Sequence, residues 1–213
     1  MLFTRLPPWP VVPHTEIVKR ARIVAIDDAD FPYLTLFRRD GYTIERWPDV
    51  RGLQKLEQGY YDIILLDLHG VGARQSADQG FGILRHLRET NPAQIVIAYS
   101  NAEWSLEYQP FFELADSVLQ KTADYVDFKR TVDDHLTERY SLGFYIDRVD
   151  SELSAYRAEL PSLRKKTDKA IRSRRIEILA DYLSPLRSND GKAVDRALQV
   201  TSVAIRIAQL WMT

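Results

Sequence analysis

Short apolar runs alternate with amphipathic segments between Arg22 and residue 139 of this chain. This alternation is the sequence signal for a parallel sheet covered by helices. Two of the runs, Ile63 to Leu66 and Ile95 to Ala98, are apolar without alternation, as expected of strands that are buried on both faces. Five strands are predicted, at Arg22–Asp27, Tyr42–Trp47, Asp62–Asp67, Gln94–Ser100 and Asp116–Gln120.

The amphipathic segments predict helices that cover this sheet. They span Phe31–Asp40, Asp49–Gln58, Gly80–Thr90, Glu103–Ala115 and, after the last strand, Asp124–Arg139. Five short strands with short links match the flavodoxin-like order, which binds ligands beyond the carboxyl ends of its strands. The predicted fold class is therefore α/β, a flavodoxin-like (βα)5 doubly wound parallel sheet followed by an all-helical C-terminal region.

The chain is predicted to divide into three parts. Residues 1–20 form a proline-rich arm, because Pro7, Pro8, Pro10 and Pro13 favour an extended chain and resist helix formation. We expect this arm to pack along a surface. Residues 21–139 form the α/β domain, and residues 140–213 form a helical output or dimerisation region.

The first helix of the C-terminal region carries a heptad pattern. Steps of four and three connect Leu142, Ile146, Val149, Leu153, Tyr156, Leu160 and Leu163. The same frame runs back into Asp124–Arg139, so one long helical element is predicted. Such a seam can pair two chains or hold a helical hairpin within one chain, and the sequence leaves both alternatives open.

Two further helices are predicted, at Leu163–Leu183 and Lys192–Trp211. Pro185 and the turn-like residues 188–191 separate them. The last helix is apolar on much of its circumference, which requires burial against another helix or another protein. We therefore predict that it forms the partner surface, either in a homodimer or with a different protein.

The composition, 45% hydrophobic and 28% charged, is that of a globular domain and excludes a disordered chain. The apolar stretch Val203–Met212 is shorter than the roughly 20 residues of a membrane-spanning helix. Residues 1–13 lack the continuous apolar segment of a secretory signal. With no cysteine in the chain, disulfides and thiol metal sites are excluded. We expect a cytoplasmic protein without membrane contact.

The net charge of −1 conceals an asymmetry between the two ends of the chain. From Tyr140 onward there are 13 Lys and Arg residues against 9 Asp and Glu residues, whereas the preceding part has 16 against 21. A basic run between Arg164 and Arg175 could contact nucleic acid. The interspersed Asp168 and the absence of a convincing helix-turn-helix pattern favour a solvated helix face instead.

Polar residues occupy the ends of the predicted strands. Asp27 and Asp28 end the first strand, Asp67 the third and Ser100 the fourth, and Lys121 follows the fifth. Carboxylates that meet in one crevice repel each other unless a cation neutralises them, and Mg²⁺ prefers one or two carboxylates plus water. A lysine and a hydroxyl nearby suit phosphoryl transfer onto a carboxylate, for which Asp67 is the best-placed nucleophile.

These residues lie in motifs that resemble the receiver domain of bacterial response regulators. The motifs are Ile26-Asp27-Asp28, Ile63-Ile64-Leu65-Leu66-Asp67-Leu68, Gly80-Phe81-Gly82-Ile83-Leu84-Arg85, Ile95-Val96-Ile97-Ala98-Tyr99-Ser100 and Leu119-Gln120-Lys121. The resemblance covers a little over half of the chain.

The resemblance implies a role for each matching residue. It implies that Asp67 is phosphorylated, that the Ser100 hydroxyl moves toward the phosphate and that Lys121 contacts it. It further implies that Asp28 and Asp67 bind Mg²⁺ directly, Asp27 through water, and His69 through its backbone carbonyl.

The chain departs from the family pattern at four places. Thr122 replaces the proline that usually follows the lysine, and Val118 replaces the aromatic residue three positions before it. Asn101 stands where a small residue is common, and the loop 69–80 is longer than usual. The glycines of that loop are compatible with mobility over the site and equally with a tolerated surface insertion.

The leading hypothesis is a signalling protein that accepts a phosphoryl group on Asp67 from a histidine kinase or phosphotransfer protein. Phosphorylation would then be relayed to the helical output region. Thr122 and Val118 motivate an alternative, a receiver-like adaptor that works by protein binding alone. A third reading is a nucleic-acid-binding regulator that uses the basic helices. No phosphate-cradling glycine loop, nucleophile elbow or histidine metal motif supports another enzyme class.

Overall fold

The computed structural model describes residues 8–101 and 109–211. Its five strands are all parallel and form one sheet in the order β2-β1-β3-β4-β5. This is the flavodoxin-like order, and it confirms the predicted fold class. The strands are β1 (Arg22–Ile26), β2 (Thr43–Trp47), β3 (Ile63–Asp67), β4 (Ile95–Ser100) and β5 (Ser117–Gln120).

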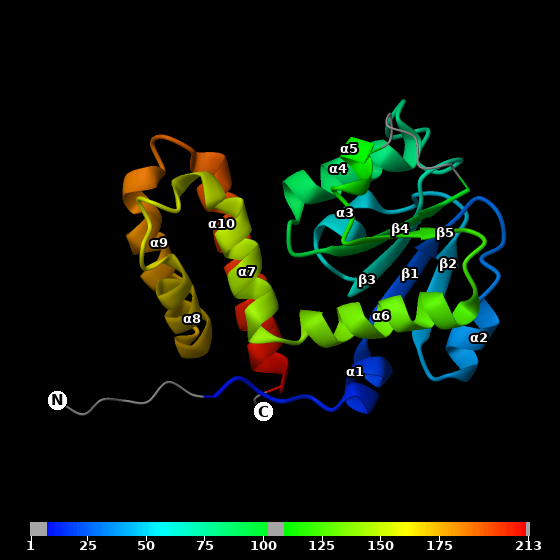
Figure 1. The fold of residues 1–213 in the computed structure, drawn as a ribbon, viewed down its shortest axis with the longest axis horizontal. Helices are drawn as coiled ribbons and strands as arrows, with labels where there is room; N and C mark the ends of the chain where they lie inside the picture. Colours follow the sequence, from blue (N-terminus) through cyan, green and yellow to red (C-terminus); the bar gives the residue numbers. More distant parts are fainter. Residues whose placement is uncertain (1–7, 102–108, 212–213) are drawn as a thin grey trace. The chain divides into compact units, whose positions relative to one another are not determined.

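Helices cover both faces of the sheet (Figure 1). One face carries α2 (Leu34–Arg39) and α6 (Tyr125–Arg139), and the other carries α3 (Leu53–Glu57), α4 (Gln79–Thr90) and α5 (Gln109–Phe112). The helix predicted over Glu103–Ala115 corresponds in part to α5, because residues 102–108 lie outside the described ranges.

The central strands form the core of this α/β unit. Every residue of β3 and β4 is buried, which explains why their apolar residues do not alternate with polar ones. Full burial of a Leu or Ile side chain contributes roughly 1.5–3 kcal/mol, so these two strands supply much of the folding free energy. The polar residues Asp67 and Ser100, at the ends of the two strands, are also buried.

A helix that the sequence pattern does not predict, α1 (His14–Arg20), precedes the first strand. The extended conformation expected for residues 1–20 is therefore wrong over this segment. The last proline of the arm, Pro13, is the N-cap of α1, a position that needs no backbone donor. Ile17 and Val18 are buried where α1 contacts α6 and β2, and this burial favours the helix.

The chain divides into two compact units. The α/β unit spans Pro13–Arg139, whereas residues 8–12 group with residues 140–211. Within this second unit, the Trp9 indole Nε1–H donates to the Tyr140 carbonyl oxygen at 2.7 Å. The Trp9 ring also lies against Tyr145, with 6.3 Å between the ring centroids.

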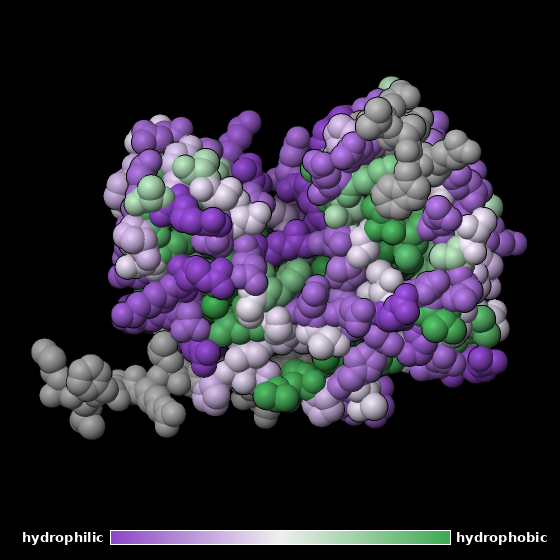
Figure 2. Space-filling model, viewed as in Figure 1, coloured by the Kyte–Doolittle hydropathy of each residue, from purple (hydrophilic) through white to green (hydrophobic). Residues whose placement is uncertain are grey.

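From Tyr140 onward, the second unit is built from helices. It contains α7 (Leu142–Glu152), α8 (Leu163–Ser173), α9 (Glu177–Leu183) and α10 (Gly191–Trp211), with two 3-10 helices, η1 (Ser154–Tyr156) and η2 (Ser184–Leu186). The α10 helix packs against α7 and α8, and buries Ala193, Val194, Ala197, Val200, Ala204 and Ala208. Much of its apolar circumference is therefore covered within the chain. Hydrophilic residues dominate the face of this unit seen in Figure 2.

The single long helix predicted from the heptad pattern is wrong. The α6 helix ends at Arg139, and Ser141 is extended and caps α7 by accepting a hydrogen bond from the Phe144 amide at 3.2 Å. An N-cap side chain satisfies a backbone donor that a helix cannot satisfy internally, so it fixes a new helix start. The heptad residues are spread over the stretch from α7 to the start of α8, including the turns between these helices. Val149, Leu153, Leu160 and Leu163 among them are buried in the chain.

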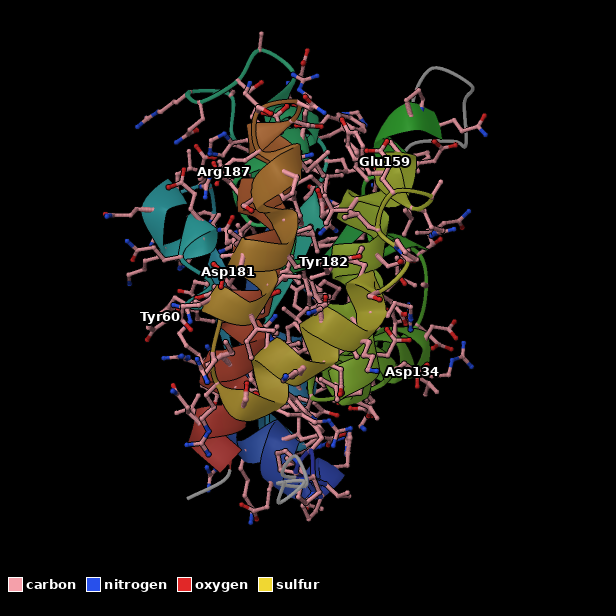
Figure 3. The ribbon with its side chains drawn as sticks, turned by 90° about the vertical axis from the view of Figure 1, so that its left-hand side faces the viewer. Tyr60, Asp134, Glu159, Asp181, Tyr182 and Arg187 are labelled. Atoms are coloured by element: carbon pink, nitrogen blue, oxygen red, sulfur yellow. The ribbon has the colours of Figure 1, made fainter. Side chains whose placement is uncertain are left out.

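The helix predicted over Leu163–Leu183 is divided into α8 and α9. The break is at Arg174, which ends α8 in the left-handed conformation with φ of 57°. Figure 3 shows Tyr182 on α9 beside α8, and its hydroxyl oxygen accepts a hydrogen bond from the Ser162 amide at 3.1 Å. Among the described helices, none combines the length and the apolar composition needed to cross a bilayer.

Candidate functional site: an acidic cluster at the carboxyl edge of the sheet

The site lies where four strands end. Asp27 follows β1, Asp67 is the last residue of β3, Ser100 is the last residue of β4, and Lys121 follows β5. Because the strands are parallel, their carboxyl ends share one edge of the sheet. This edge therefore collects side chains that are far apart in sequence.

Three carboxylates form the centre of the site. One carboxylate oxygen from each of Asp27, Asp28 and Asp67 lies within 4.8 Å of the others. Asp27 and Asp67 are 2% and 1% exposed, whereas Asp28 is exposed. Like charges this close repel each other strongly at low dielectric, so the cluster requires positive charge.

Lys121 supplies part of that charge. Its Nζ lies 2.5 Å from Asp67 Oδ2 and 3.3 Å from Asp27 Oδ1. Its backbone amide donates to the Ser100 carbonyl oxygen at 3.0 Å, which holds the residue beside the end of β4. Burial lowers the pKa of Lys121, but the hydrogen bond and charge of Asp67, together with Asp27, outweigh burial and raise the pKa overall. The amine is therefore a stable cation.

The Asp67 carboxylate is held from two sides. Its Oδ1 accepts a hydrogen bond from the His69 amide at 3.2 Å, and its Oδ2 accepts the bond from Lys121. Burial raises the pKa of Asp67 despite these hydrogen bonds, and the nearby charge of Asp27 adds to the increase. A carboxylate with a raised pKa is more basic, and hence more nucleophilic when ionised, than an exposed one.

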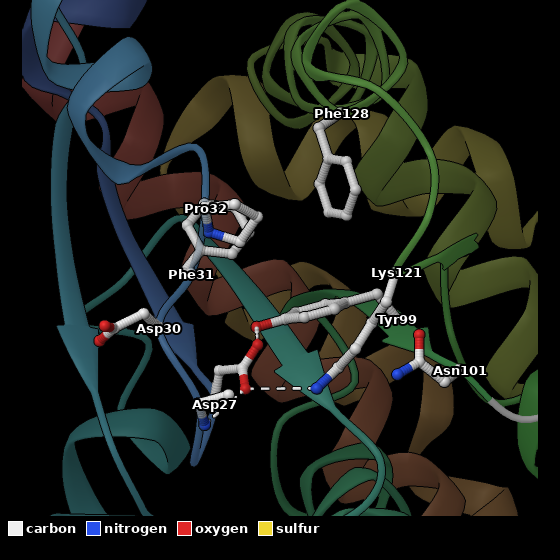
Figure 4. A pocket seen from close by; sticks show the side chains of 9 residues that line it. Asp27, Asp30, Phe31, Pro32, Tyr99, Asn101, Lys121 and Phe128 are labelled. Atoms are coloured by element: carbon white, nitrogen blue, oxygen red, sulfur yellow. Dashed lines mark hydrogen bonds and ion pairs between the residues drawn. The ribbon is translucent and has the colours of Figure 1, made fainter.

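A buried tyrosine contacts the cluster from within β4. The Tyr99 hydroxyl donates to Asp27 Oδ2 at 2.9 Å (Figure 4). Burial, followed by the charge of Asp27 and the hydrogen bond to it, raises the pKa of Tyr99 well above 10. The phenol therefore remains protonated and acts as a donor.

The Arg46 side chain, on β2, fixes the loop that carries the acidic pair. Its Nη2 lies 3.2 Å from the backbone carbonyl oxygens of both Asp27 and Asp28, and its Nε donates to the Ala29 carbonyl oxygen at 3.0 Å. Its Nη1 also lies 3.3 Å from Asp30 Oδ1. A planar guanidinium with several donors can hold such a set of oxygens in one geometry.

Two glycines allow close approaches around the cluster. Gly70 has φ of 82°, and a Cβ atom there would lie 2.4 Å from Asp28 Oδ2. A Cβ atom on Gly80, in the first turn of α4, would lie 2.3 Å from the Asp67 carbonyl oxygen. Only glycine permits such contacts. The loop 69–80 is closed by the Gly70 amide, which donates to Gln79 Oε1 at 2.7 Å. It is tied to its surroundings by the Gly72 amide, which donates to Asp49 Oδ1 at 2.6 Å.

A cavity of about 290 Å³ adjoins the cluster. Its walls include Phe31, Pro32, Tyr99 and Phe128, and its polar side includes Asp27, Asn101 and Lys121 (Figure 4). The cavity gives solvent access to the Lys121 side chain, which is 23% exposed. Asn101, which departs from the family pattern, is therefore a lining residue of the cavity.

The donor set fits a hard divalent cation. Three carboxylates face one ammonium group, so the cluster retains negative charge after Lys121 is counted. Asp28 is exposed and bonded through Oδ1 to the Ala29 amide, and Asp67 Oδ1 is bonded to a single amide, so both carboxylates can accept a further partner. Oxygen-only ligand sets of this type suit Mg²⁺.

Comparison with known proteins gives matches among solved structures. No family model matches the chain, and no curated protein matches its sequence. Several of the matching structures are receiver domains. A CheY-like response regulator receiver domain from Methanospirillum hungatei is 23% identical, and the match covers 56% of this chain and 95% of that one with a TM-score of 0.46.

Two further structures match a similar share of the chain. A chemotaxis protein from Vibrio cholerae is 20% identical, with 54% of this chain and 97% of that one covered and a TM-score of 0.43. A response regulator from Thermotoga maritima, solved in complex with Mg²⁺ and BeF, is 19% identical, with 54% and 98% covered and a TM-score of 0.40. After the sequence motifs that it contains, we call Pro13–Arg139 the receiver-like unit.

The receiver-like unit brings the expected site residues to one edge of the sheet. Asp27, Asp28, Asp67 and Lys121 meet directly, and Ser100 lies buried at the end of the neighbouring strand. His69 follows Asp67, and its ring contacts the Phe81 ring with 5.3 Å between centroids. Sequence reasoning missed Tyr99 and Arg46. A tyrosine in the aliphatic run Ile95-Val96-Ile97-Ala98 was a usable signal, because a buried hydroxyl requires a partner.

Proposed function

We propose that this chain is a signalling protein that accepts a phosphoryl group on Asp67 in a Mg²⁺-dependent reaction. The observation that carries the proposal is the Lys121 ammonium, which bridges Asp67 and Asp27 beside a third carboxylate at the ligand-binding edge of the sheet. A phosphate-accepting carboxylate needs this combination, because the incoming phosphoryl oxygens carry negative charge that must be neutralised.

In the proposed step, a carboxylate oxygen of Asp67 attacks the phosphorus atom of a phosphohistidine. An O–P bond forms, the P–N bond breaks, and the imidazole leaves with the bonding electron pair. The Lys121 ammonium, which lies on Asp67 Oδ2 and is partly exposed, turns outward onto the phosphoryl oxygens and uncovers the carboxylate. The Ser100 hydroxyl then donates to one of these oxygens.

The residues that would hold Mg²⁺ are Asp28, Asp67 and the His69 backbone carbonyl, with Asp27 acting through water. When bound, Mg²⁺ would neutralise the negative charge of the phosphoryl oxygens that the single positive charge of Lys121 does not balance.

The partner implied by this chemistry is a histidine kinase or phosphotransfer protein that presents a phosphohistidine. Phosphorylation adds charge at the end of β3, next to the end of β4. The helical unit is the proposed output region, in the cytoplasm. A homodimer or a partner protein would read the change through the C-terminal helices. Sedimentation velocity with and without beryllofluoride, in wild type and Asp67→Asn, measures whether association follows the state of the site.

The decisive experiment is incubation with Mg²⁺ and a small phosphodonor such as acetyl phosphate, followed by intact mass spectrometry. We expect wild type to gain one phosphoryl group that hydroxylamine removes, as it does from an acyl phosphate, and Asp67→Asn to gain none. Asp30→Asn is the matched control, because Asp30 lies in the loop after β1 with a 99% exposed side chain and is not part of the cluster. This control should be phosphorylated like wild type.

A wild type that gains no phosphoryl group would favour the receiver-like adaptor. Thr122 motivates that reading because it stands where receiver domains usually carry proline, and its hydroxyl donates to Gln120 Oε1 at 3.3 Å. Val118 is half-buried against the core.

A second candidate function is nucleic-acid binding through α8. Arg164 and Arg172 are paired with Asp147 and Asp168, each at 2.7 Å. Within the described residues, no ion pair involves the exposed Lys165, Lys169, Arg174 and Arg175, and this observation favours the second candidate. Salt-dependent binding that is lost on neutralising Arg172, Arg174 and Arg175 would support this function.

A further inference from the structure

The Asp27 carboxylate has both oxygens engaged by donors from different parts of the receiver-like unit. Oδ1 accepts from the Lys121 ammonium at 3.3 Å and from the Ala29 amide at 3.0 Å, whereas Oδ2 accepts from the Tyr99 hydroxyl at 2.9 Å. Asp27 is 2% exposed, so water contributes little to holding it. The orientation of this carboxylate is therefore set by protein donors.

Aromatic packing fixes the position of the Tyr99 hydroxyl. The Tyr99 side chain is 1% exposed, and its ring lies 5.8 Å from the Phe31 ring and 5.7 Å from the Phe128 ring, measured between centroids. Phe31 comes from the loop after β1 and Phe128 from α6, so the ring is held by two elements outside its own strand. In Figure 4 the phenol points away from the Phe128 side and toward Asp27.

We propose that Tyr99 is a positioning residue, whose hydroxyl turns one oxygen of Asp27 away from the acidic cluster and thereby holds the other toward Lys121. The proposal rests on the proposed function, because it concerns how the same site holds Mg²⁺. With Oδ2 engaged by Tyr99 and Oδ1 by two donors, Asp27 contributes through charge and bridging water, and leaves direct coordination to Asp28 and Asp67.

The physical reason is preorganisation. Without the Tyr99 hydroxyl, Oδ2 would face aromatic walls with no donor, and the carboxylate would turn to find one. That turn would change the charge and the bridging water that Asp27 offers to the metal, while Lys121 stays bonded to Asp67. Removal of a side chain that hydrogen-bonds to a metal ligand and orients it lowers metal affinity by roughly 10- to 100-fold.

The test is a Mg²⁺ titration of Tyr99→Phe by isothermal titration calorimetry, with no phosphodonor present. Phenylalanine keeps the ring contacts and removes only the hydroxyl. We expect Mg²⁺ to bind roughly 10- to 100-fold more weakly than to wild type. In acetyl phosphate assays, half-maximal labelling should need correspondingly more Mg²⁺, while the rate at saturating Mg²⁺ stays near that of wild type.

The matched control is Tyr61→Phe. Tyr61 is also 1% exposed, and its hydroxyl donates to the Glu45 carboxylate, which is not part of the cluster. This variant loses the same kind of buried hydrogen bond and should bind Mg²⁺ like wild type. A loss of affinity equal in both variants would overturn the proposal, because a general loss of stability would then explain the effect.

A double variant tests whether Tyr99 affects Mg²⁺ binding through the Asp27 carboxylate. If Tyr99 acts on this carboxylate, Tyr99→Phe should have no further effect on Mg²⁺ binding in an Asp27→Asn background. Unchanged Mg²⁺ affinity in Tyr99→Phe, an altered circular dichroism spectrum of that variant, or additive effects in the double variant would each overturn the proposal.

The outcomes separate this inference from the proposed function. A wild type that binds Mg²⁺ but gains no phosphoryl group contradicts the phosphoryl-accepting role. The role of Tyr99 is then still tested by the Mg²⁺ affinity of Tyr99→Phe relative to wild type. A wild type that binds no Mg²⁺ overturns both.

Discussion

The Arg139 guanidinium, at the last residue of α6, donates from Nε to Asp62 Oδ1 at 2.9 Å at the amino edge of the sheet. Asp62 Oδ2 accepts from the Arg22 amide at 2.8 Å, and Arg139 Nη1 donates to the Ala93 carbonyl oxygen at 3.1 Å. One buried ion pair thus joins α6 to the starts of β1, β3 and β4, at the edge opposite the acidic cluster.

Removal of one partner of this pair should destabilise the receiver-like unit. Asp62→Ala leaves the Arg139 cation buried without its carboxylate, and we expect the free energy of unfolding to fall by about 3–5 kcal/mol. Urea unfolding followed by circular dichroism measures the change. Asp147→Ala, which removes the exposed partner of Arg164, is the control and should change stability by less than about 1 kcal/mol. If Asp62→Ala and Asp147→Ala lowered the free energy of unfolding equally, the stabilising role of the Asp62–Arg139 ion pair would be contradicted.

Gly80→Ala should impair both folding and the site. The new Cβ atom would lie 2.3 Å from the Asp67 carbonyl oxygen, so α4 or the end of β3 must shift. Overpacking of this kind costs about 1–3 kcal/mol, and we expect slower labelling by acetyl phosphate as well. Gly143→Ala, on α7, meets only ordinary contacts and should stabilise its helix by about 0.5–1 kcal/mol. A Gly80→Ala protein as stable and as reactive as wild type would contradict the close approach.

Arg174→Gly should stabilise the helical unit. A residue with a side chain in the left-handed conformation costs about 1–2 kcal/mol, and glycine at a helix end relieves that cost. We expect a higher midpoint of thermal unfolding. Arg175→Gly is the matched control, because this neighbour has no positive φ and glycine there gains nothing. If both substitutions lowered the midpoint, the break between α8 and α9 would have another cause.

Mg²⁺ should stabilise wild type against unfolding. A ligand present at a hundredfold excess over its Kd adds about 2.7 kcal/mol to the free energy of unfolding. Asp28→Asn should lose most of this gain, because Asp28 is the exposed member of the cluster and a proposed direct ligand. NaCl at matched ionic strength controls for screening. The same gain in Asp28→Asn as in wild type would argue against binding at the cluster.

Local sequence signals locate the strand ends well. The apolar runs of β3 and β4 stop just before Asp67 and Ser100, which are the last residues of these strands. Parallel topology then places both residues at one edge of the sheet. The meeting of Asp27, Asp67 and Lys121 was thus predictable before any coordinates. The roles of these residues remain predictions until phosphorylation is measured.

Contacts that depend on packing between distant segments were not predictable in the same way. Arg46 reaches the loop after β1 because β2 lies beside β1, and nothing in the local sequence of β2 marks that arginine. The heptad steps around Leu153 satisfied a helix pattern, yet the Ser141 cap and the buried contacts of α10 determined where the helices begin and end. Periodicity reports which side chains are buried, but not which element buries them.

Trp9 and Tyr140 have a consequence for how the chain can be cut. Because the indole of Trp9 is bonded to the Tyr140 carbonyl within the helical unit, the backbone leaves that unit near Pro13 and returns to it after Arg139. The receiver-like unit is thus tethered at both ends, and cleavage of either joint alone would leave it covalently attached. A truncation at residue 139 would remove Tyr140, whose carbonyl oxygen accepts the hydrogen bond from the Trp9 indole. The shortened protein would then carry Trp9 near its amino end without this hydrogen bond.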